Sequence, residues 1–327
     1  MKKYIGIDLG GTNIKVGLVD ETGTIVHKKS IKTQAERTGE AIVADMARVT
    51  LEVIAEAGCT QSDVESIGIG SPGTPNNKTG ELIVAYNLPF RHMPMRREMK
   101  KTVSLPVYID NDANVAALAE SEFGAARGSS SSVTITLGTG VGGGIVINNR
   151  IFSGFNNAGS EIGHMVIKSG GEACTCGRKG CFEAYASATA LIRDTERAAL
   201  QNPASILNAM IAENGGKASG RSSFDAMRQG DAVATTVVAD YIEMLSEGLA
   251  NVINTFMPEI IVIGGGVCNE GDALMVPLLE KTYDKAKSFL AEGVPAPKIR
   301  VAEMGNDAGI VGAAMMGRRC LEDGLPG

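Results

Sequence analysis

Two segments of this 327-residue chain share one pattern, in which a strand is followed by a glycine–threonine turn and a returning strand. The first segment is YIGIDLGGTNIKVGLVD at 4–20, and the second is VTITLGTGVGGGIVINN at 133–149. Two copies of one module predict an internally duplicated α/β protein with two lobes, each contributing a turn whose backbone N–H groups can bind phosphate. The chain is also longer than one hydrophobic core usually organises, which favours two lobes on size alone.

Strands and helices alternate along the rest of the chain, a pattern typical of a mainly parallel sheet. Apolar spacing and helix-forming residues predict helices at 39–58, 113–124, 184–200, 232–256 and 308–319. Buried strands are expected at 66–73, 105–114, 259–267 and 298–305, and a further helix is expected directly after Gly264–Gly266. The small, polar segment at 124–132 is expected to connect the lobes. Because ligands gather at the C-terminal ends of parallel strands, the polar residues that follow these strands are the candidate functional residues.

The strand at 105–114 ends in Asp110, Asn111 and Asp112. Asp112 lies where a catalytic base would be useful, although it could instead only cap the helix that follows. Strand alternation directs Asp110 to the opposite face from Asn111, and no role is expected for Asp110. Asp8 ends the first strand of the chain and could hold Mg²⁺ through water beside the first glycine turn.

The stretch GSEIGHMVIKSGGEACTCGRKGCFE at 159–183 combines His164 with Cys174, Cys176 and Cys181. One imidazole and three thiolates complete a tetrahedral shell for Zn²⁺, which is the closed, structural kind of zinc site. Buried free cysteines or a disulfide are the alternatives, but Cys174 and Cys176 are too close in sequence to pair easily. The spacing favours a structural zinc ion that makes this polar loop rigid, with the acids of the loop available to a polyhydroxylated ligand.

The composition argues against several classes of protein. With a net charge of −6, 4% aromatic residues and no tryptophan, the chain has neither the basic surface nor the aromatic platform typical of nucleic-acid binding. The N-terminus lacks the apolar stretch of a secretion signal, and no apolar run approaches the ~18 residues of a membrane span. Cys59, Cys268 and Cys320 lie apart within apolar segments, as reduced thiols do. We expect a cytoplasmic protein without nucleic-acid or membrane partners.

Five motifs occur in the order DLGGTNIK at 8–15, IDNDAN at 109–114, LGTGVGGGIV at 137–146, EIGH at 161–164 and CTCGRKGCFE at 174–183. Together they resemble the ROK family of repressors, open reading frames and sugar kinases, over nearly the whole chain. The resemblance implies the actin-like ATPase fold of hexokinases, with two lobes around a cleft and a C-terminal helix that crosses back to the N-terminal lobe. The expected lobes are 1–118 plus 308–327 and 119–307, the second with the zinc-binding loop.

Carried over motif by motif, the resemblance implies a role for each candidate residue, with Asp112 as the general base. The expected sugar contacts are Gly73, Asn87, Asn111, Asp112, Glu161, His164 and Glu183. The expected ATP- and phosphate-binding residues are Asp8, Gly10, Gly11, Thr12, Lys15, Gly138, Thr139, Gly140, Gly264, Gly265 and Gly266, with Asp8 near Mg²⁺. His164 is also expected to join the three cysteines as a zinc ligand.

The resemblance implies an ATP-dependent kinase for the 6-hydroxyl of a hexose, with glucose favoured and N-acetylmannosamine or another hexose as the alternative. After Gly73 the chain reads TPNNKTGEL, where the family commonly continues with Val-Asp, so the choice of hexose is left open. A sugar-responsive repressor of the family would carry a helix-turn-helix segment before the first strand, and only MKK precedes Tyr4. A sugar-binding protein without catalysis would lack the base or a phosphate turn. Family members are commonly homodimers or homotetramers, and we expect one of these assemblies.

Overall fold

The computed structural model describes residues 1–327 and divides into two compact units. The first unit comprises 1–134, 144–160 and 303–327, and the second comprises 135–143 and 161–302. The division passes through strands β9 (Ser131–Leu137) and β10 (Val141–Ile147), so this hairpin contributes to both units. Residues 119–134 and 144–160 group with the first unit here, and the expected lobes at 1–118 plus 308–327 and at 119–307 stay a prediction.

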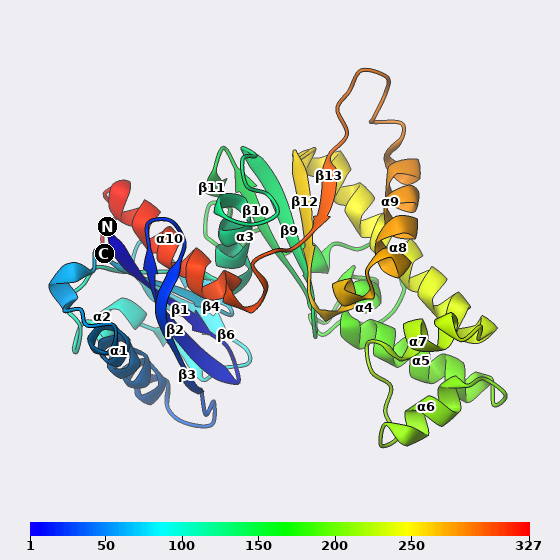
Figure 1. Ribbon diagram of the computed structural model, residues 1–327, viewed down its shortest axis with the longest axis horizontal. Helices are drawn as coiled ribbons and strands as arrows, with labels where there is room; N and C mark the ends of the chain where they lie inside the picture. The colour runs from blue at the N-terminus through cyan, green and yellow to red at the C-terminus, as the bar shows by residue number, and fades with distance from the viewer. The chain divides into compact units, whose positions relative to one another are not determined.

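A five-stranded sheet with the order β3-β2-β1-β4-β8 forms the centre of the first unit (Figure 1). Its strands are β1 (Lys3–Leu9), β2 (Asn13–Asp20), β3 (Ile25–Lys32), β4 (Ile67–Ser71) and β8 (Val107–Asn111). Strand β1 pairs antiparallel with β2 and parallel with β4, which pairs parallel with β8. Asp8, Gly70 and Asp110 lie in one row of this register. The C-terminal ends of three parallel strands therefore meet at one edge of the sheet, as the sequence predicted.

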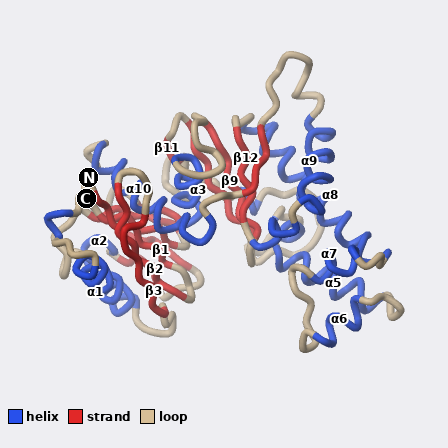
Figure 2. The backbone as a smooth tube through the Cα atoms, in the orientation of Figure 1, coloured by secondary structure: helices blue, strands red, loops and turns tan.

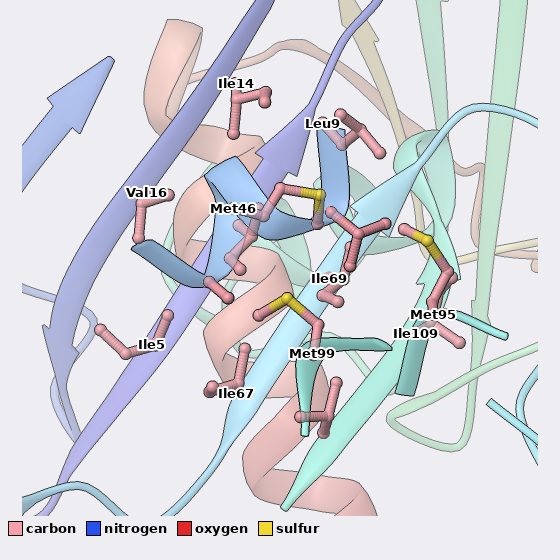
Figure 3. Close-up of a cluster of buried hydrophobic side chains, with 14 of the residues drawn as sticks. Ile5, Leu9, Ile14, Val16, Met46, Ile67, Ile69, Met95, Met99 and Ile109 are labelled. Carbon is pink, nitrogen blue, oxygen red and sulfur yellow. The ribbon is translucent and has the colours of Figure 1, made fainter. Parts of the chain in front are cut away.

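Helices cover both faces of this sheet. Successive side chains on a strand point to opposite faces, so neighbouring residues of β1 pack in two different cores. Ile5 and Leu9 of β1 are fully buried in a core that includes residues of α1 (Gly39–Glu56) and α2 (Met95–Met99), shown in Figure 3. Tyr4 packs in a different core with α3 (Asp112–Glu122) and α10 (Ala308–Glu322). Figure 1 shows α1 and α10 on opposite sides of the sheet.

Helix α10 approaches the sheet so closely that glycine is required on the strands. A Cβ atom on Gly6 would lie 1.8 Å from the carbonyl oxygen of Ile310, and one on Gly68 would lie 1.8 Å from that of Ala313. A side chain at either position would push the helix away from the sheet. The C-terminal helix thus packs within the first unit, as the resemblance implied.

The first unit also contains a three-stranded sheet with the order β5-β6-β7 that the sequence did not predict. Its strands are β5 (Thr74–Asn76), β6 (Glu81–Ala85) and β7 (Phe90–Met93). Strand β5 begins directly after Gly73, whose φ of 98° favours glycine and whose Cβ would lie 2.0 Å from the carbonyl oxygen of Val84. The segment that departs from the family pattern is therefore an ordered hairpin.

The second sheet has the order β11-β10-β9-β12-β13, and β12 pairs with β13 in parallel. The strands not yet given are β11 (Arg150–Ile151), β12 (Ile260–Gly264) and β13 (Lys298–Val301). The second unit's helices are α4 (Glu183–Ala186), α5 (Ala188–Gln201), α6 (Leu207–Glu213), α7 (Ser222–Arg228), α8 (Ala232–Phe256) and α9 (Asp272–Ala286). Figure 2 shows α5 to α9 gathered on one side of β12. None of the helices combines the length and the apolar character needed to cross a bilayer.

Two helices of the second unit differ from the sequence prediction. The helix expected at 184–200 is interrupted at Ser187, whose Oγ accepts a hydrogen bond from the N–H of Ala190 at 3.1 Å and caps α5. The helix expected directly after Gly264–Gly266 begins only at Asp272, because a 3₁₀ turn at Gly266–Glu270 comes first. Helix α8, in contrast, has the predicted bounds of Ala232–Phe256.

Candidate active site

Asn111 and Asp112 lie where strand β8 ends and helix α3 begins. Asn111 is the N-cap residue of α3, since its Oδ1 accepts hydrogen bonds from the N–H groups of Ala113 at 2.9 Å and Asn114 at 3.4 Å. Asp112 is the first helical residue, half-buried, and its Oδ1 also accepts from Ala113 at 2.9 Å. Because Asn111 already caps the helix, the Asp112 carboxylate is not required for that purpose. Asp112 lies at the positive end of the helix dipole, a favourable place for an acidic side chain.

The first glycine–threonine turn joins β1 to β2 at the same edge of the sheet. Asp8 and Lys15 are partners across this hairpin, with Lys15 Nζ 2.9 Å from Asp8 Oδ2. The N–H of Gly10 donates to the carbonyl of Asn13 at 2.9 Å, which closes the turn and leaves Thr12 exposed. The turn thus offers a carboxylate that could hold a divalent cation and an ammonium group that could bind phosphate.

Gly73 and Asn87, two of the expected sugar contacts, belong to the first unit as well. Asn111 Nδ2 donates a hydrogen bond to the carbonyl oxygen of Gly73 at 3.2 Å. Asn87 is exposed, and a Cβ atom on Gly11 would lie 3.4 Å from its Nδ2. The structure therefore brings Gly73 to Asn111 and Asp112, and it places Asn87 beside the first glycine turn.

Asp110 has a structural environment that the sequence analysis missed. Its side chain is 3% exposed, forms no ion pair, and accepts hydrogen bonds from the backbone N–H of Asn111 at 2.7 Å, from Asn114 Nδ2 at 2.9 Å and from Asn77 Nδ2 at 3.0 Å. Burial raises the pKa of this carboxyl group, and the three donors act in the opposite direction. A charged residue at the end of a buried strand was the signal that it needs partners.

Glu183 stands between the cysteine-rich loop and the second glycine–threonine turn. Its Oε2 accepts a hydrogen bond from the N–H of Val141 at 3.1 Å, and its Oε1 accepts one from Thr175 Oγ1 at 3.0 Å. A Cβ atom on Gly140 would lie 2.3 Å from the same Oε2, so the absence of a side chain at 140 makes room for the carboxylate. The structure thus connects Glu183 to the turn at 138–140, a link that was not expected from the sequence.

The third glycine turn, at 264–266, also lies beside the turn at 138–140. Gly265 has a φ of 110°, and a Cβ atom there would lie 2.1 Å from the carbonyl oxygen of Leu137. Leu137 directly precedes Gly138. Two glycine turns of the second unit are therefore neighbours, and an arrangement of this kind lets a nucleotide approach the backbone closely.

His164, Cys174, Cys176 and Cys181 come together, with their ligand atoms within 4.8 Å of one another. Cys176 Sγ lies 3.6 Å from Cys181 Sγ, and Cys174 Sγ lies 3.6 Å from His164 Nδ1. With bonds of about 2.3 Å to sulfur and about 2.0 Å to nitrogen, a tetrahedral zinc site holds its ligand atoms about 3.5–3.8 Å apart. All six cysteines of the chain are free, so the disulfide alternative is excluded in this structure. The four donors fit a tetrahedral metal ion.

The thiols of this cluster have unequal acidities. Desolvation, together with hydrogen bonds to Cys176 and Cys174, raises the pKa of Cys181 to about 12. The backbone N–H of Arg178 lowers the pKa of Cys176. Metal ligation requires thiolates. A metal cation among the three sulfurs would stabilise the negatively charged thiolate of Cys181, which burial otherwise disfavours.

Comparison with known proteins bears on these residues. The model of the ROK family matches residues 4–319, nearly the whole chain. The chain belongs to the ROK family. Two curated ROK-type relatives are named glucokinase: that of Halalkalibacterium halodurans is 38% identical over 96% of this chain and 94% of its own, and that of Thermotoga maritima is 39% identical over 95% and 96%.

A solved structure provides the matching fold. The ROK family glucokinase of Streptomyces griseus, crystallised with glucose and AMPPNP, is 34% identical and superposes with a TM-score of 0.79, over 97% of this chain and 99% of its own. This ROK chain therefore has the mixed α/β, actin-like kinase fold that the sequence predicted.

In this member of the ROK family, Glu161 and His164 are joined by a short 3₁₀ turn at Ile162–His164. The N–H of His164 donates to the carbonyl oxygen of Glu161 at 3.0 Å, and the side chain of Glu161 is exposed. Because Nδ1 of His164 faces Cys174, Nε2 is the ring nitrogen left for another ligand. The expected dual role of His164, toward metal and sugar, is therefore compatible with the geometry of its own unit.

Proposed function

We propose that this protein is an ATP-dependent hexose kinase that transfers the γ-phosphoryl group of ATP to the 6-hydroxyl of glucose. The observation that carries the proposal is the position of Asp112, which starts a helix already capped by Asn111 and so presents a carboxylate that the fold does not need for capping. The similarity to glucokinases over nearly the full length of each chain supports glucose as the substrate.

In this reaction the protein mainly has to align the hydroxyl with the phosphoryl group and to accept one proton. Asp112 accepts the proton of the attacking 6-hydroxyl, and Asn111 and Gly73 hold neighbouring hydroxyl groups. Glu161, His164 and Asn87 complete the sugar contacts, together with Glu183. The sugar-binding role of these residues follows from the family motifs and from the polar groups that each presents.

The phosphates of ATP are bound by the glycine turns. Each unit offers its own expected phosphate-binding groups: Gly10, Gly11, Thr12 and Lys15 in the first unit, and Gly138, Thr139, Gly140 and the turn at 264–266 in the second. Asp8 is the oxygen ligand that this chain would offer to Mg²⁺, which would supply charge neutralisation for the transferred phosphoryl group. Lys15, which pairs with Asp8 at 2.9 Å, is placed to exchange that partner for phosphate.

The cluster of His164 and three cysteines holds a structural zinc ion. Sulfur–sulfur and sulfur–nitrogen separations of 3.6 Å match tetrahedral coordination, and four protein ligands leave no position for a reacting water. Zinc held by these four residues would make the loop that carries Cys174, Thr175 and Cys176 rigid, and with it the hydrogen bond from Thr175 to Glu183. Zinc here has a structural and not a chemical role.

A panel of hexoses, each supplied with ATP in a coupled assay for ADP release, tests the function. We expect kcat/KM for glucose to exceed that for N-acetylmannosamine and mannose by at least ~10-fold, the discrimination that one well-placed polar contact provides. A higher kcat/KM for N-acetylmannosamine would correct the substrate while keeping the reaction. ADP release with none of the hexoses would overturn the proposed function.

A further inference from the structure

Asp110 is a buried carboxylate surrounded by neutral hydrogen-bond donors. Its Oδ1 accepts from the N–H of Asn111 and from Asn114 Nδ2, and its Oδ2 accepts from Asn77 Nδ2, at 2.7, 2.9 and 3.0 Å. A buried charge without an ion-pair partner is costly, so each of these hydrogen bonds matters more than it would at the surface. We therefore expect the Asp110 carboxylate to hold its three donors in a defined arrangement.

The three donors come from two segments that are far apart in sequence. Asn111 and Asn114 belong to the turn and the first helical turn that flank Asp112, whereas Asn77 lies in the hairpin loop between β5 and β6. The Oδ1 atoms of Asn77 and Asn114 have no hydrogen-bond partner, so the bond to Asp110 is what orients each amide group. A second bridge runs in parallel, from Asn111 Nδ2 to the carbonyl oxygen of Gly73 at 3.2 Å.

We propose that Asp110 is a positioning residue of the kinase reaction, which ties the hairpin loop at 77–80 to the turn that carries Asn111 and Asp112. This inference rests on the proposed function. The same hairpin begins directly after Gly73, an expected sugar contact, so the Asn77–Asp110 bond joins the segment that follows Gly73 to the turn that carries Asn111 and Asp112. Asp110 touches neither sugar nor phosphate and acts only through its neighbours.

A carboxylate suits this position because it is an acceptor at both oxygens, whereas an amide is an acceptor at one end and a donor at the other. In Asp110→Asn the new NH₂ group would face either the NH₂ of Asn77 or the donors of Asn111 and Asn114. In Asn77→Asp two carboxylates would face each other. In the double variant the polarity of the bond is reversed, because the amide introduced at position 110 can donate to the carboxylate introduced at position 77, and the bridge can form again.

The experiment compares these three variants with Asn76→Asp, which adds the same charge at the adjacent residue, the last of β5. Asn76 Oδ1 accepts from the N–H groups of Lys78 and Thr79, and a carboxylate can do the same, so this control should keep kcat within about 2-fold. We expect each single variant to lower kcat for glucose by roughly 10–100-fold, the usual effect of displacing a catalytic group by a fraction of an ångström to an ångström. The double variant should recover to within about 5-fold of the parent.

Hydrogen exchange supplies a measurement that does not depend on turnover. The amides of 111–115 should exchange faster in both single variants and return toward the parent rate in the double variant. Wild-type protein that phosphorylates no hexose would refute the proposed function, while the exchange pattern would still decide the positioning role. Single variants with parental kinetics and exchange, or a double variant whose kcat loss is the product of the two single losses, would overturn the inference.

If Asp110→Asn fails to fold, Asn77→Ala carries the same test. It leaves the carboxylate and its two other donors in place and removes only the bond from the loop. We expect a smaller fall in kcat, by roughly 3–10-fold, together with faster exchange at 111–115. Unchanged kinetics and exchange in this variant would equally overturn the inference.

Discussion

Replacing Asp112 with Asn separates the two roles that this residue could have. The amide keeps the size of the side chain and an oxygen that can accept from the N–H of Ala113, as Oδ1 does now at 2.9 Å. It removes the negative charge and the basicity. The N-cap contacts of Asn111 are untouched by the change, so the start of α3 should remain intact.

The expected magnitudes differ enough to distinguish a helix-stabilising carboxylate from a catalytic base. Loss of a favourable charge in the first turn of a helix costs about 0.3–1 kcal/mol of folding free energy. Loss of a positioned general base lowers kcat by roughly 10²–10⁴, which corresponds to about 2.7–5.4 kcal/mol of transition-state stabilisation. Asp112→Asn should therefore fold with near-parental stability and turn over glucose at least ~100-fold more slowly.

Three measurements test this prediction: glucose-dependent ADP release, the glucose Kd by calorimetry, and the free energy of unfolding in urea. The Kd should change by less than about 10-fold, because a neutral hydrogen bond to the sugar survives. Asp272→Asn is the matched control, since Asp272 is also the first residue of a helix, α9, and is exposed. Turnover by Asp112→Asn within a few-fold of the parent, with the fold intact, would show that Asp112 is not the base.

Three further predictions concern the zinc loop, the second phosphate turn and the packing of α10. Cys181→Ser should abolish the binding of one zinc per chain, measured by elemental analysis, and lower the melting temperature, whereas full zinc content would exclude Cys181 as a ligand. Gly140→Ala places Cβ 2.3 Å from Glu183 Oε2 and should raise the KM for ATP by roughly 5–10-fold at near-constant stability; an unchanged KM would refute the link. Gly68→Ala should cost about 3 kcal/mol in urea unfolding. Gly220→Ala, with open space around the new Cβ, should be neutral, and equal losses in both would contradict the packing argument.

Features that depend on neighbouring residues in the sequence were predictable. The apolar spacing of α8 gave its bounds, and the spacing of His164 and the three cysteines indicated a cluster whose atoms the structure brings within 4.8 Å. The glycine–threonine turns were predictable because glycine allows the backbone to make a short turn between two strands. Each of these signals is contained within a short window of sequence, so no knowledge of distant contacts was required.

Features that depend on distant contacts were missed. Ser187 interrupts an apparently continuous helix because its hydroxyl caps α5, and helical spacing alone could not favour the cap over continuation. Asp110 binds Asn77 from a loop 33 positions earlier, and Glu183 binds Val141 42 positions earlier. A buried polar side chain can be expected to have a hydrogen-bond partner, but which residue is the partner depends on the folded backbone.

The contacts of Glu183 also determine what the second phosphate turn can offer. The N–H of Val141 is taken by Glu183, and the N–H of Gly138 donates to the carbonyl oxygen of Gly140 at 3.0 Å. If this turn binds phosphate, as we propose, the donors that it can offer are the N–H groups of Thr139 and Gly140 and the exposed Thr139 hydroxyl. Hydrogen bonds from the N–H of Val141 and the hydroxyl of Thr175 engage both oxygens of the Glu183 carboxylate and fix its position beside this turn. Because Thr175 lies between Cys174 and Cys176, Glu183 links the cysteine-rich loop directly to the turn at 138–140.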